Sequence, residues 1–412
     1  MKMNSRYVLT LKVAALICIV LISSGCRPSP TSFYYRMASL PDDGDTTFYE
    51  PPSSDSLLSN PSGQEVRNVI LCIGDGMGFE HVALARHFSV GDVHKLHMER
   101  LPIQGAVTTR SASNAVTDSA AAATAMATGI KTNNGMISMA PDETPYSTIL
   151  ELLQTKGWRT GLVATSAISH ATPAGFASHV DSRDKQKEIA RQLLDNRVDV
   201  MLGGGQKYWS DDLLAEARIG GYQMIENRDQ MLALNPAPVI GLFADDGMDT
   251  VAPEPMLPEM ADVAIKLLNS PGKEWFSPTP KFFLMIEGSQ IDWAAHANET
   301  DRTIRQTLLF DMAVRQAVDF ARADKKTLVI VTADHETGGL KLEPTDDGGL
   351  KAKWTSGNHT GARVPLYAYG PGSEKFAGTM DNTDIPKRIA DLMGIETFPI
   401  TRALVQSANV RE

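Results

Sequence analysis

Cysteine is scarce in this sequence, with three residues in a chain of 412. Cys18 and Cys26 lie in the first 26 residues, and Cys72 lies within an apolar run. Once a leader is removed, at most one ordinary thiol remains, so a disulfide framework is excluded. The stability of the chain must therefore come from core packing, to which bound metals can add. Cys72 itself is expected to be a buried strand residue rather than a reactive thiol.

Basic runs are also lacking. The net charge is -10, and beyond the extreme N-terminus no run of Lys or Arg is long enough to follow a phosphate backbone. This argues against nucleic acid as the main partner. A small phosphorylated substrate remains compatible with the charge, because a bound metal can reverse the local electrostatic field.

The N-terminus has the pattern of a secretory signal over residues 1–26. Three basic residues precede the apolar run 13–22, which is too short for a comfortable membrane span, and small residues lead to Cys26. We therefore expect an exported protein, in the periplasm or on the outer surface of a bacterium. Cys26 resembles the lipid-attachment site of bacterial lipoproteins, although Ser23 stands where Leu is usual. A lipid anchor through Cys26 and ordinary signal cleavage both remain open.

The rest of the chain divides into segments that differ in composition and in the periodicity of apolar residues. Residues 27–65 are rich in Ser, Pro and Asp and are expected to form a flexible linker. From Val66 onward, short apolar runs alternate with helical patterns, which indicates βαβ units and a mostly parallel sheet. Residues 206–280 are the least regular and are interpreted as a partly peripheral insertion, and residues 396–412 as a C-terminal tail. The expected strands are 68–73, 160–164, 198–202, 281–286, 327–332 and 364–369, and the expected helices are 147–155, 185–196, 258–269, 300–323 and 385–393.

Acidic residues and histidines follow three of these strands. Asp75 follows the first, Glu287 the fourth, and the pair Asp334 and His335 the fifth. Ligands bind outside the carboxyl ends of the strands in open parallel sheets. The sequence therefore predicts that these side chains meet at one edge of the sheet.

Residues 116–129 place a hydroxyl at the start of a helix. Their Ala-rich part favours a helix that ends at Gly129, and Thr117, Asp118 or Ser119 can cap its beginning. Backbone N–H groups and the helix dipole favour anions there. Taken alone, the segment is more often a simple N-cap, so a nucleophilic Ser119 depends on what else lies beside it.

Metal ligation explains the acidic and imidazole residues best. Asp292 and His296 are spaced to share one side of a helical turn, and a third imidazole would complete a zinc shell with an open position. The candidates for that imidazole are His335, His359 and His170. Each pair alone could equally be structural, but together with Asp75 and Glu287 the residues exceed the needs of one metal. They suggest two zinc ions and a harder third ion, an arrangement suited to phosphoryl transfer.

These residues belong to segments that closely resemble the alkaline phosphatases. The segments start at Gly74, Val116, His170, Glu287, Thr332 and His359, occur in the family's order, and span nearly everything from Val66 to Met393. The resemblance implies a three-layer α/β/α catalytic domain over residues 66–395. It also implies hydrolysis of phosphate monoesters through a phosphoserine intermediate and, more weakly, a homodimer.

The resemblance also implies roles for individual residues. Ser119 would be the nucleophile, Arg183 would bind the phosphate, and Asp118 would orient Arg183. Two zinc ions and one magnesium ion would be the cofactors. The implied ligands are Asp292, His296 and His359 for the first zinc, Asp75, Asp334 and His335 for the second, and Asp75, Thr172 and Glu287 for the magnesium.

Two positions depart from the best-known bacterial pattern, which has Asp and Lys where this chain has His170 and Trp293. Both side chains are expected to lie just behind the ligands. An imidazole near the third site favours zinc there more than aspartate does. Trp293 removes a positive charge near the phosphate, so we expect phosphate to be held less tightly.

The sequence favours three other functions less. A phosphodiesterase of the same superfamily is less favoured, because Arg183 suits a terminal phosphate. A sulfatase lacks support, because no segment suited to forming its formylglycine is present. An inactive zinc-binding scaffold is disfavoured by the intact Ser119.

Overall fold

The computed structural model describes residues 46, 48–61, 63–91, 93–236, 238–251, 253–271, 280–346 and 349–409. The predicted signal with Cys26 lies outside these residues, as does most of the predicted linker. Within the described part of the chain, no helix is long and apolar enough to cross a membrane.

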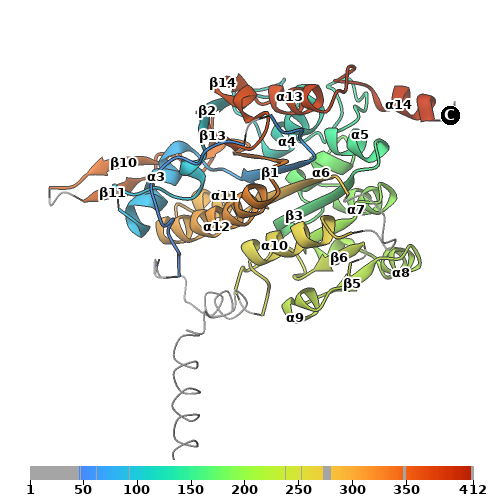
Figure 1. The fold of residues 1–412 in the computed structure, drawn as a ribbon, viewed down its shortest axis with the longest axis horizontal. Coiled ribbons are helices and arrows are strands. Elements are labelled where there is room, and N and C mark those ends of the chain that lie inside the picture. The colour runs from blue at the N-terminus through green and yellow to red at the C-terminus, as the bar shows by residue number, and fades with distance from the viewer. Residues whose placement is uncertain are drawn as a thin grey trace, which may run out of the picture.

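A ten-stranded sheet forms the centre of the molecule, in the order β14-β2-β13-β8-β1-β7-β3-β4-β6-β5 (Figure 1). Its middle strands are continuous apolar runs that are buried on both faces, as expected for a parallel sheet covered by helices. β13 is antiparallel to both of its neighbours. The strands are β1 (Asn68–Gly74), β2 (Ile103–Thr108), β3 (Arg159–Ala167), β4 (Val200–Gly204), β5 (Gln223–Ile225), β6 (Val239–Leu242), β7 (Phe282–Gly288), β8 (Thr327–Thr332), β13 (Val364–Tyr369) and β14 (Gly378–Asp381).

Helices cover both faces of the sheet, which confirms the predicted three-layer α/β/α architecture (Figure 1). One group packs around the long helix α12, and the other packs around α4 and α6. The first group is α3 (Phe79–Ser89), α10 (Leu257–Leu268), α11 (Gln290–His296) and α12 (Thr300–Asp324). The second is α4 (Ser119–Thr128), α5 (Ile149–Thr155), α6 (Ala171–Ala177), α7 (Gln186–Asp195) and α13 (Asp384–Leu392).

Smaller elements complete the described chain. Two short two-stranded sheets lie outside the central one, and the pair β9 and β12 carries site residues discussed below. The remaining elements are η1 (Met98–Arg100), η2 (Gln206–Tyr208), α8 (Asp211–Ile219), α9 (Arg228–Leu232), β9 (Glu336–Thr337), β10 (Lys341–Pro344), β11 (Leu350–Lys353), β12 (His359–Thr360), η3 (Ser373–Phe376) and α14 (Arg402–Asn409).

The strand register aligns the carboxyl ends of the central strands. Ile73 of β1 pairs with Glu287 of β7 and with Thr332 of β8. Glu287 also pairs with Ala164 of β3. The turns after these strands therefore begin at the same edge, as predicted, and the side chains that follow can converge.

The predicted insertion, residues 206–280, extends one edge of the central sheet. It supplies β6, which is parallel to β4, and β5, which is parallel to β6. The sequence pattern missed these strands because they are short. The helix that returns the chain to the sheet was predicted at 258–269 and is α10.

The segment before β1 differs from the expected flexible linker in the part that the structure describes. Phe48 and Tyr49 are buried in the core, and the Tyr49 hydroxyl donates to Asp311 Oδ2 at 2.5 Å. Asn60 Nδ2 donates to Ser373 Oγ at 2.8 Å. The aromatic side chains of this polar segment therefore anchor it to the catalytic domain. The predicted tail likewise contains α14, and Arg402 donates to Asn196 Oδ1.

Candidate active site

Ser119 is the first residue of helix α4. Asp118 is the N-cap, and its Oδ1 accepts from the backbone N–H of Ala121 at 3.0 Å. Gly129 ends the helix in the left-handed conformation with φ of 73°. Ser119 is 2 % exposed, and its Oγ lies 3.2 Å from His335 Nε2. The hydroxyl thus lies at the positive end of a helix and beside an imidazole from β8's end.

Asp75, Asp334 and His335 form one cluster with ligand atoms within 4.8 Å of one another. All three side chains are fully buried. His335 Nε2 lies 3.1 Å from Asp334 Oδ2 and 3.5 Å from Asp75 Oδ1. The turns after β1 and β8 thus bring together the residues that the resemblance assigns to the second zinc.

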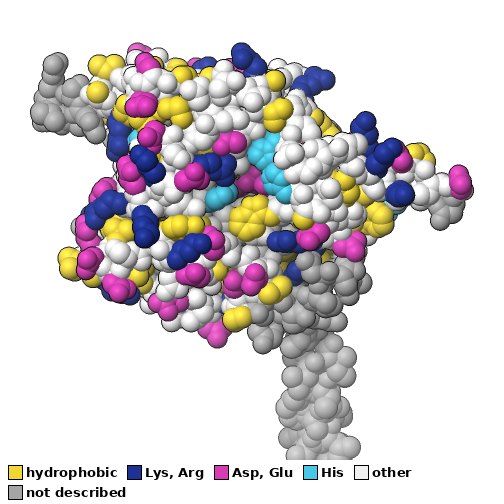
Figure 2. All heavy atoms as spheres, turned by 180° about the vertical axis from the view of Figure 1, so that it is seen from behind, with side chains coloured by type: hydrophobic (Ala, Val, Ile, Leu, Met, Phe, Trp, Pro, Cys, Tyr) yellow, Lys and Arg dark blue, Asp and Glu magenta, His cyan; other side chains and the backbone are white. Residues whose placement is uncertain are grey.

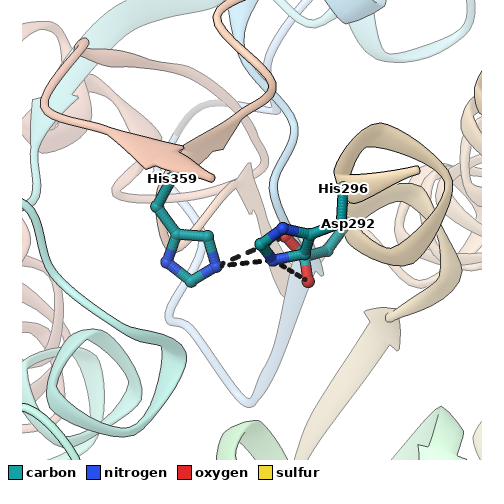
Figure 3. A group of neighbouring side chains, drawn as sticks. All are labelled: Asp292, His296 and His359. Carbon is teal, nitrogen blue, oxygen red and sulfur yellow. Dashed lines mark hydrogen bonds and ion pairs between the residues drawn. The ribbon is translucent and has the colours of Figure 1, made fainter. Parts of the chain in front are cut away.

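Asp292, His296 and His359 form a second cluster under the same distance criterion. Asp292 and His296 project from α11, and His359 reaches them from β12 (Figure 3). His296 Nε2 lies 3.0 Å from His359 Nε2 and 3.4 Å from Asp292 Oδ2. Of the three imidazoles that the sequence left open, the structure therefore selects His359 for this cluster.

Backbone carbonyls orient the two imidazoles. His296 Nδ1 lies 2.7 Å from the carbonyl oxygen of Gly357, and His359 Nδ1 lies 3.0 Å from that of Thr117. Each Nδ1 therefore carries the proton, and each Nε2 offers a lone pair to the cluster. The His335 and His359 rings stack with centroids 3.5 Å apart, which places the two clusters side by side. Histidine side chains gather in the middle of one face of the molecule with acidic atoms between them (Figure 2).

A third group of oxygen atoms lies behind the first two. Asp75, Thr172 and Glu287 are completely buried. Among the described residues, no hydrogen-bond partner reaches Glu287 Oε1 or either carboxylate oxygen of Asp75. Buried polar atoms are normally paired, so this concentration of unpaired oxygens fits ligands that face cations.

The electrostatics of these groups also fit bound cations. Burial, together with the charges of Asp334 and Asp292, raises the pKa of Asp75 well above its ordinary value. Burial raises the pKa of Glu287 to about 7, although hydrogen bonds from the hydroxyls of Ser289 and Thr172 act in the opposite direction and lower it. Burial acts in the same direction on Asp334, but the charge of His335 holds its pKa below the usual range. Carboxylates crowded in this way repel one another unless positive charge is supplied.

Arg183 is held beside the start of α4. Its Nη1 donates to Asp118 Oδ2 at 3.1 Å, and the same oxygen accepts from the backbone N–H of Gly135 at 3.0 Å. The Arg183 side chain is 24 % exposed, so one side of the guanidinium remains accessible. Asp118 thus caps α4 with one oxygen and fixes Arg183 with the other.

His170 and Trp293 pack against each other beside Arg183. Their rings are 6.1 Å apart, edge to face at 86°. His170 Nε2 lies 3.1 Å from Arg183 Nη2, and its buried Nδ1 has no partner among the described residues. Burial and the charge of Arg183 lower the pKa of His170 to about 3. The imidazole is therefore neutral and accepts a hydrogen bond from Arg183.

Thr337 was missed by sequence reasoning. Its buried Oγ1 lies 2.5 Å from Asp292 Oδ1 and 3.2 Å from His335 Nδ1, so it joins the two clusters. It also pairs with His359 across β9 and β12, and its N–H donates to the Gly76 carbonyl oxygen. Its position two residues after His335 is the only sequence signal that could have found it.

A hydroxyl at a helix N-terminus, an arginine beside it and adjoining clusters of acids and imidazoles define the class of hydrolases that act on phosphate esters. Comparison with known proteins gives the family. The model of the family described as alkaline phosphatase matches residues 66–352 and 349–395. The chain belongs to the alkaline phosphatase family and is a phosphatase.

Individual relatives agree with this assignment. Alkaline phosphatase 3 of Bacillus subtilis is 35% identical over 82% of this chain and 91% of its own length. The solved alkaline phosphatase from the Antarctic bacterium TAB5 has a TM-score of 0.75 and 34% identity, covering 81% of this chain and 99% of its own. A cold-active alkaline phosphatase from Shewanella has a TM-score of 0.72 and 28% identity, and the match covers 80% of this chain and 100% of its own.

Proposed function

We propose that this protein hydrolyses phosphate monoesters to an alcohol and inorganic phosphate through a phosphoserine on Ser119. The observation that carries the proposal is the position of Ser119 Oγ, at the N-terminus of α4 and 3.2 Å from His335 in the buried acidic cluster. An oxygen in that environment is stabilised as an anion by the helix dipole and by nearby positive charge.

Arg183 would bind two non-bridging oxygens of the phosphoryl group. A planar guanidinium suits this bidentate contact, and Asp118 and His170 hold it from two sides. Ser119 Oγ then forms a bond to phosphorus while the bond to the alcohol oxygen breaks, and the alcohol leaves with a proton. Water hydrolyses the phosphoserine, which restores the Ser119 hydroxyl and releases phosphate.

Metal ions would supply the missing positive charge. Asp292, His296 and His359 would hold one zinc, and Asp75, Asp334 and His335 would hold another. When bound, two such ions stabilise negative charge on the attacking and leaving oxygens. The mixed imidazole and carboxylate donors of both clusters are those that zinc prefers.

The third ion would be magnesium, held by Asp75, Thr172 and Glu287, whose donors are all oxygen. A TAB5 alkaline phosphatase variant with His replaced by Asp is described with Mg bound in its M3 site. Zinc is the alternative here, since His170, two residues before Thr172, offers a softer imidazole donor whose Nδ1 has no partner among the described residues.

The cellular setting is part of the proposal. We infer export through the signal at residues 1–26, to the periplasm or outer surface, with Cys26 as a candidate lipid anchor. Palmitate labelling of the wild type and a Cys26→Ser variant tests the anchor, since a labelled variant would contradict it. A homodimer is inferred from the family resemblance and is tested by sedimentation equilibrium.

The proposed activity is tested by assaying one phosphate monoester and one diester, with and without a chelator. The expected result is rapid hydrolysis of the monoester alone, lost on chelation and restored by zinc with magnesium. Equal rates on both esters, or activity that survives chelation, would overturn the proposal.

A further inference from the structure

The loop after β6 approaches the active site from the predicted insertion. β6 runs parallel to β4, so its carboxyl end lies at the same edge as the metal-ligand clusters. The loop comprises residues 243–248 and is called here the β6 loop. Its partners on the site side are side chains of α11 and the ends of β3 and β4, as the contacts below show.

Gly247 of this loop lies directly against the indole of Trp293. A Cβ atom built on Gly247 would lie 2.2 Å from Cη2 and 2.5 Å from Cζ3 of that ring. Such distances are far below van der Waals contact, so any side chain at Gly247 must displace the ring. Gly247 has no positive φ, and an alanine there is therefore conformationally allowed. The constraint is steric and is directed at Trp293.

The β6 loop cannot easily retreat from such a clash. Met248 is 2 % exposed, and its N–H donates to the Thr165 carbonyl oxygen at 3.0 Å. Gln290 Nε2 donates to the carbonyl oxygens of Met248 at 2.9 Å and Thr165 at 3.1 Å. Arg302 donates in turn to Gln290 Oε1 at 2.8 Å. The residue that follows Gly247 is thus fixed to both β3 and α11.

The residue that precedes Gly247 is held as well. Asp246 forms an ion pair with Lys207 Nζ at 2.6 Å and accepts from the Tyr208 hydroxyl at 3.3 Å. The Asp246 carbonyl oxygen lies so close to Gly204 that a Cβ there would be 2.0 Å away. Since the residues on both sides of Gly247 are held, the indole is the movable partner.

Displacement of the indole would affect the position of Arg183 through His170. Trp293 packs edge to face on His170, and His170 Nε2 accepts from Arg183. A displacement of about 1 Å at a positioning contact can cost as much as 100-fold in rate. The β6 loop, Trp293, His170 and Arg183 therefore form a continuous packed series.

We propose that Gly247 is a positioning residue, which lets the β6 loop seat Trp293 so that His170 and Arg183 are aligned for phosphate. The inference rests on the proposed function, since it assigns the insertion a part in binding the phosphoryl group.

Gly247→Ala tests the proposal, with Gly220→Ala as the matched control. Gly220 lies in the same insertion with φ of -69°, is exposed, and offers ordinary space for a Cβ. Inorganic phosphate is the probe, measured as a competitive inhibitor. Gly247→Ala is expected to raise the inhibition constant and KM by about tenfold, and Gly220→Ala by less than about twofold.

A double-mutant cycle separates positioning from general damage. Trp293→Phe removes both clashing ring atoms, so Gly247→Ala in that background is expected to change phosphate inhibition by less than about twofold. An undiminished effect in the Trp293→Phe background, or equal effects of Gly247→Ala and Gly220→Ala, would overturn the proposal.

Tryptophan fluorescence distinguishes a failure of the positioning role from a failure of the proposed phosphatase function. The emission of Trp293 is the difference between each protein and its Trp293→Phe counterpart. Acrylamide is expected to quench this component at least about twice as strongly in Gly247→Ala as in wild type, because the indole no longer packs against the β6 loop and becomes more exposed. If wild type lacks phosphatase activity, the proposed function fails while this measurement still decides the packing. Unchanged quenching would refute the positioning role.

Discussion

Thr337→Val is the most informative single change at the site. Valine has nearly the shape of threonine, so the substitution removes the hydroxyl and little else. The Thr337 hydroxyl donates to Asp292 Oδ1 at 2.5 Å. Since its proton is used there, it accepts from His335 Nδ1 at 3.2 Å. Thr337 thereby leaves the lone pair of His335 Nε2 facing Ser119 and the carboxylates of Asp75 and Asp334.

The size of the effect follows from these contacts. A hydrogen bond to a charged group contributes about 1.5–3 kcal/mol, and Thr337 is completely buried, so no water replaces its hydroxyl. Loss of a bond that orients a metal ligand typically weakens metal binding about 10- to 100-fold. We expect a decrease of that size in zinc affinity for Thr337→Val, with a parallel loss of activity at limiting zinc.

The assay is a zinc titration against a chromophoric chelator, combined with far-UV circular dichroism of the metal-free protein. Thr337→Ser keeps the hydroxyl and is the matched control, expected to bind zinc within about threefold of wild type. If Thr337→Val binds zinc as tightly as Thr337→Ser while both are folded, the bridging role of the hydroxyl is refuted.

Three further changes test separate parts of the structure. Trp293→Lys should strengthen inhibition by phosphate about fivefold, since a cation near the phosphate adds roughly 1 kcal/mol; an unchanged inhibition constant would contradict this. Glu259→Ala should lower the free energy of unfolding by about 3–5 kcal/mol, because it removes the carboxylate that pairs with the buried Arg228. Glu343→Ala, at an exposed ion pair, should leave the denaturant midpoint nearly unchanged, and equal midpoints for the two variants would refute the argument. Burial raises the pKa of Glu254 from 4.5 to about 7, so its contribution to stability is complete below pH 4.5 and is lost as pH rises through 7. Glu254→Gln should therefore gain stability relative to wild type between pH 5 and pH 8, and a constant difference across that range would contradict the assignment.

The core of the fold could be predicted because its signals are local. The strand at residues 327–332 was predicted with the observed bounds, since a short apolar run buried on both faces needs no partner information. The strands β5 and β6 were not predicted. They are too short to show a period, and their place is set by pairing with β4, which is a tertiary property.

The site could be predicted where chemistry follows a strand end. The sequence placed Asp75, Asp334 and His335 at one edge, and the structure brings them into one cluster. The choice of His359 over the other imidazoles needed the fold, because β12 brings it to the site by pairing with β9, which lies more than 20 residues earlier in the chain. Thr337 and Gly247 could not be identified, since their roles lie in contacts that neither residue type signals.

Transfer of the phosphoryl group to Ser119 is tested most directly by an acid quench during turnover with a labelled phosphate monoester. The labelled residue is then mapped in wild type and in Ser119→Ala. We expect labelled phosphoserine at Ser119 in wild type and none in Ser119→Ala, with the variant folded and still binding zinc. A labelled phosphoserine elsewhere in Ser119→Ala would contradict it.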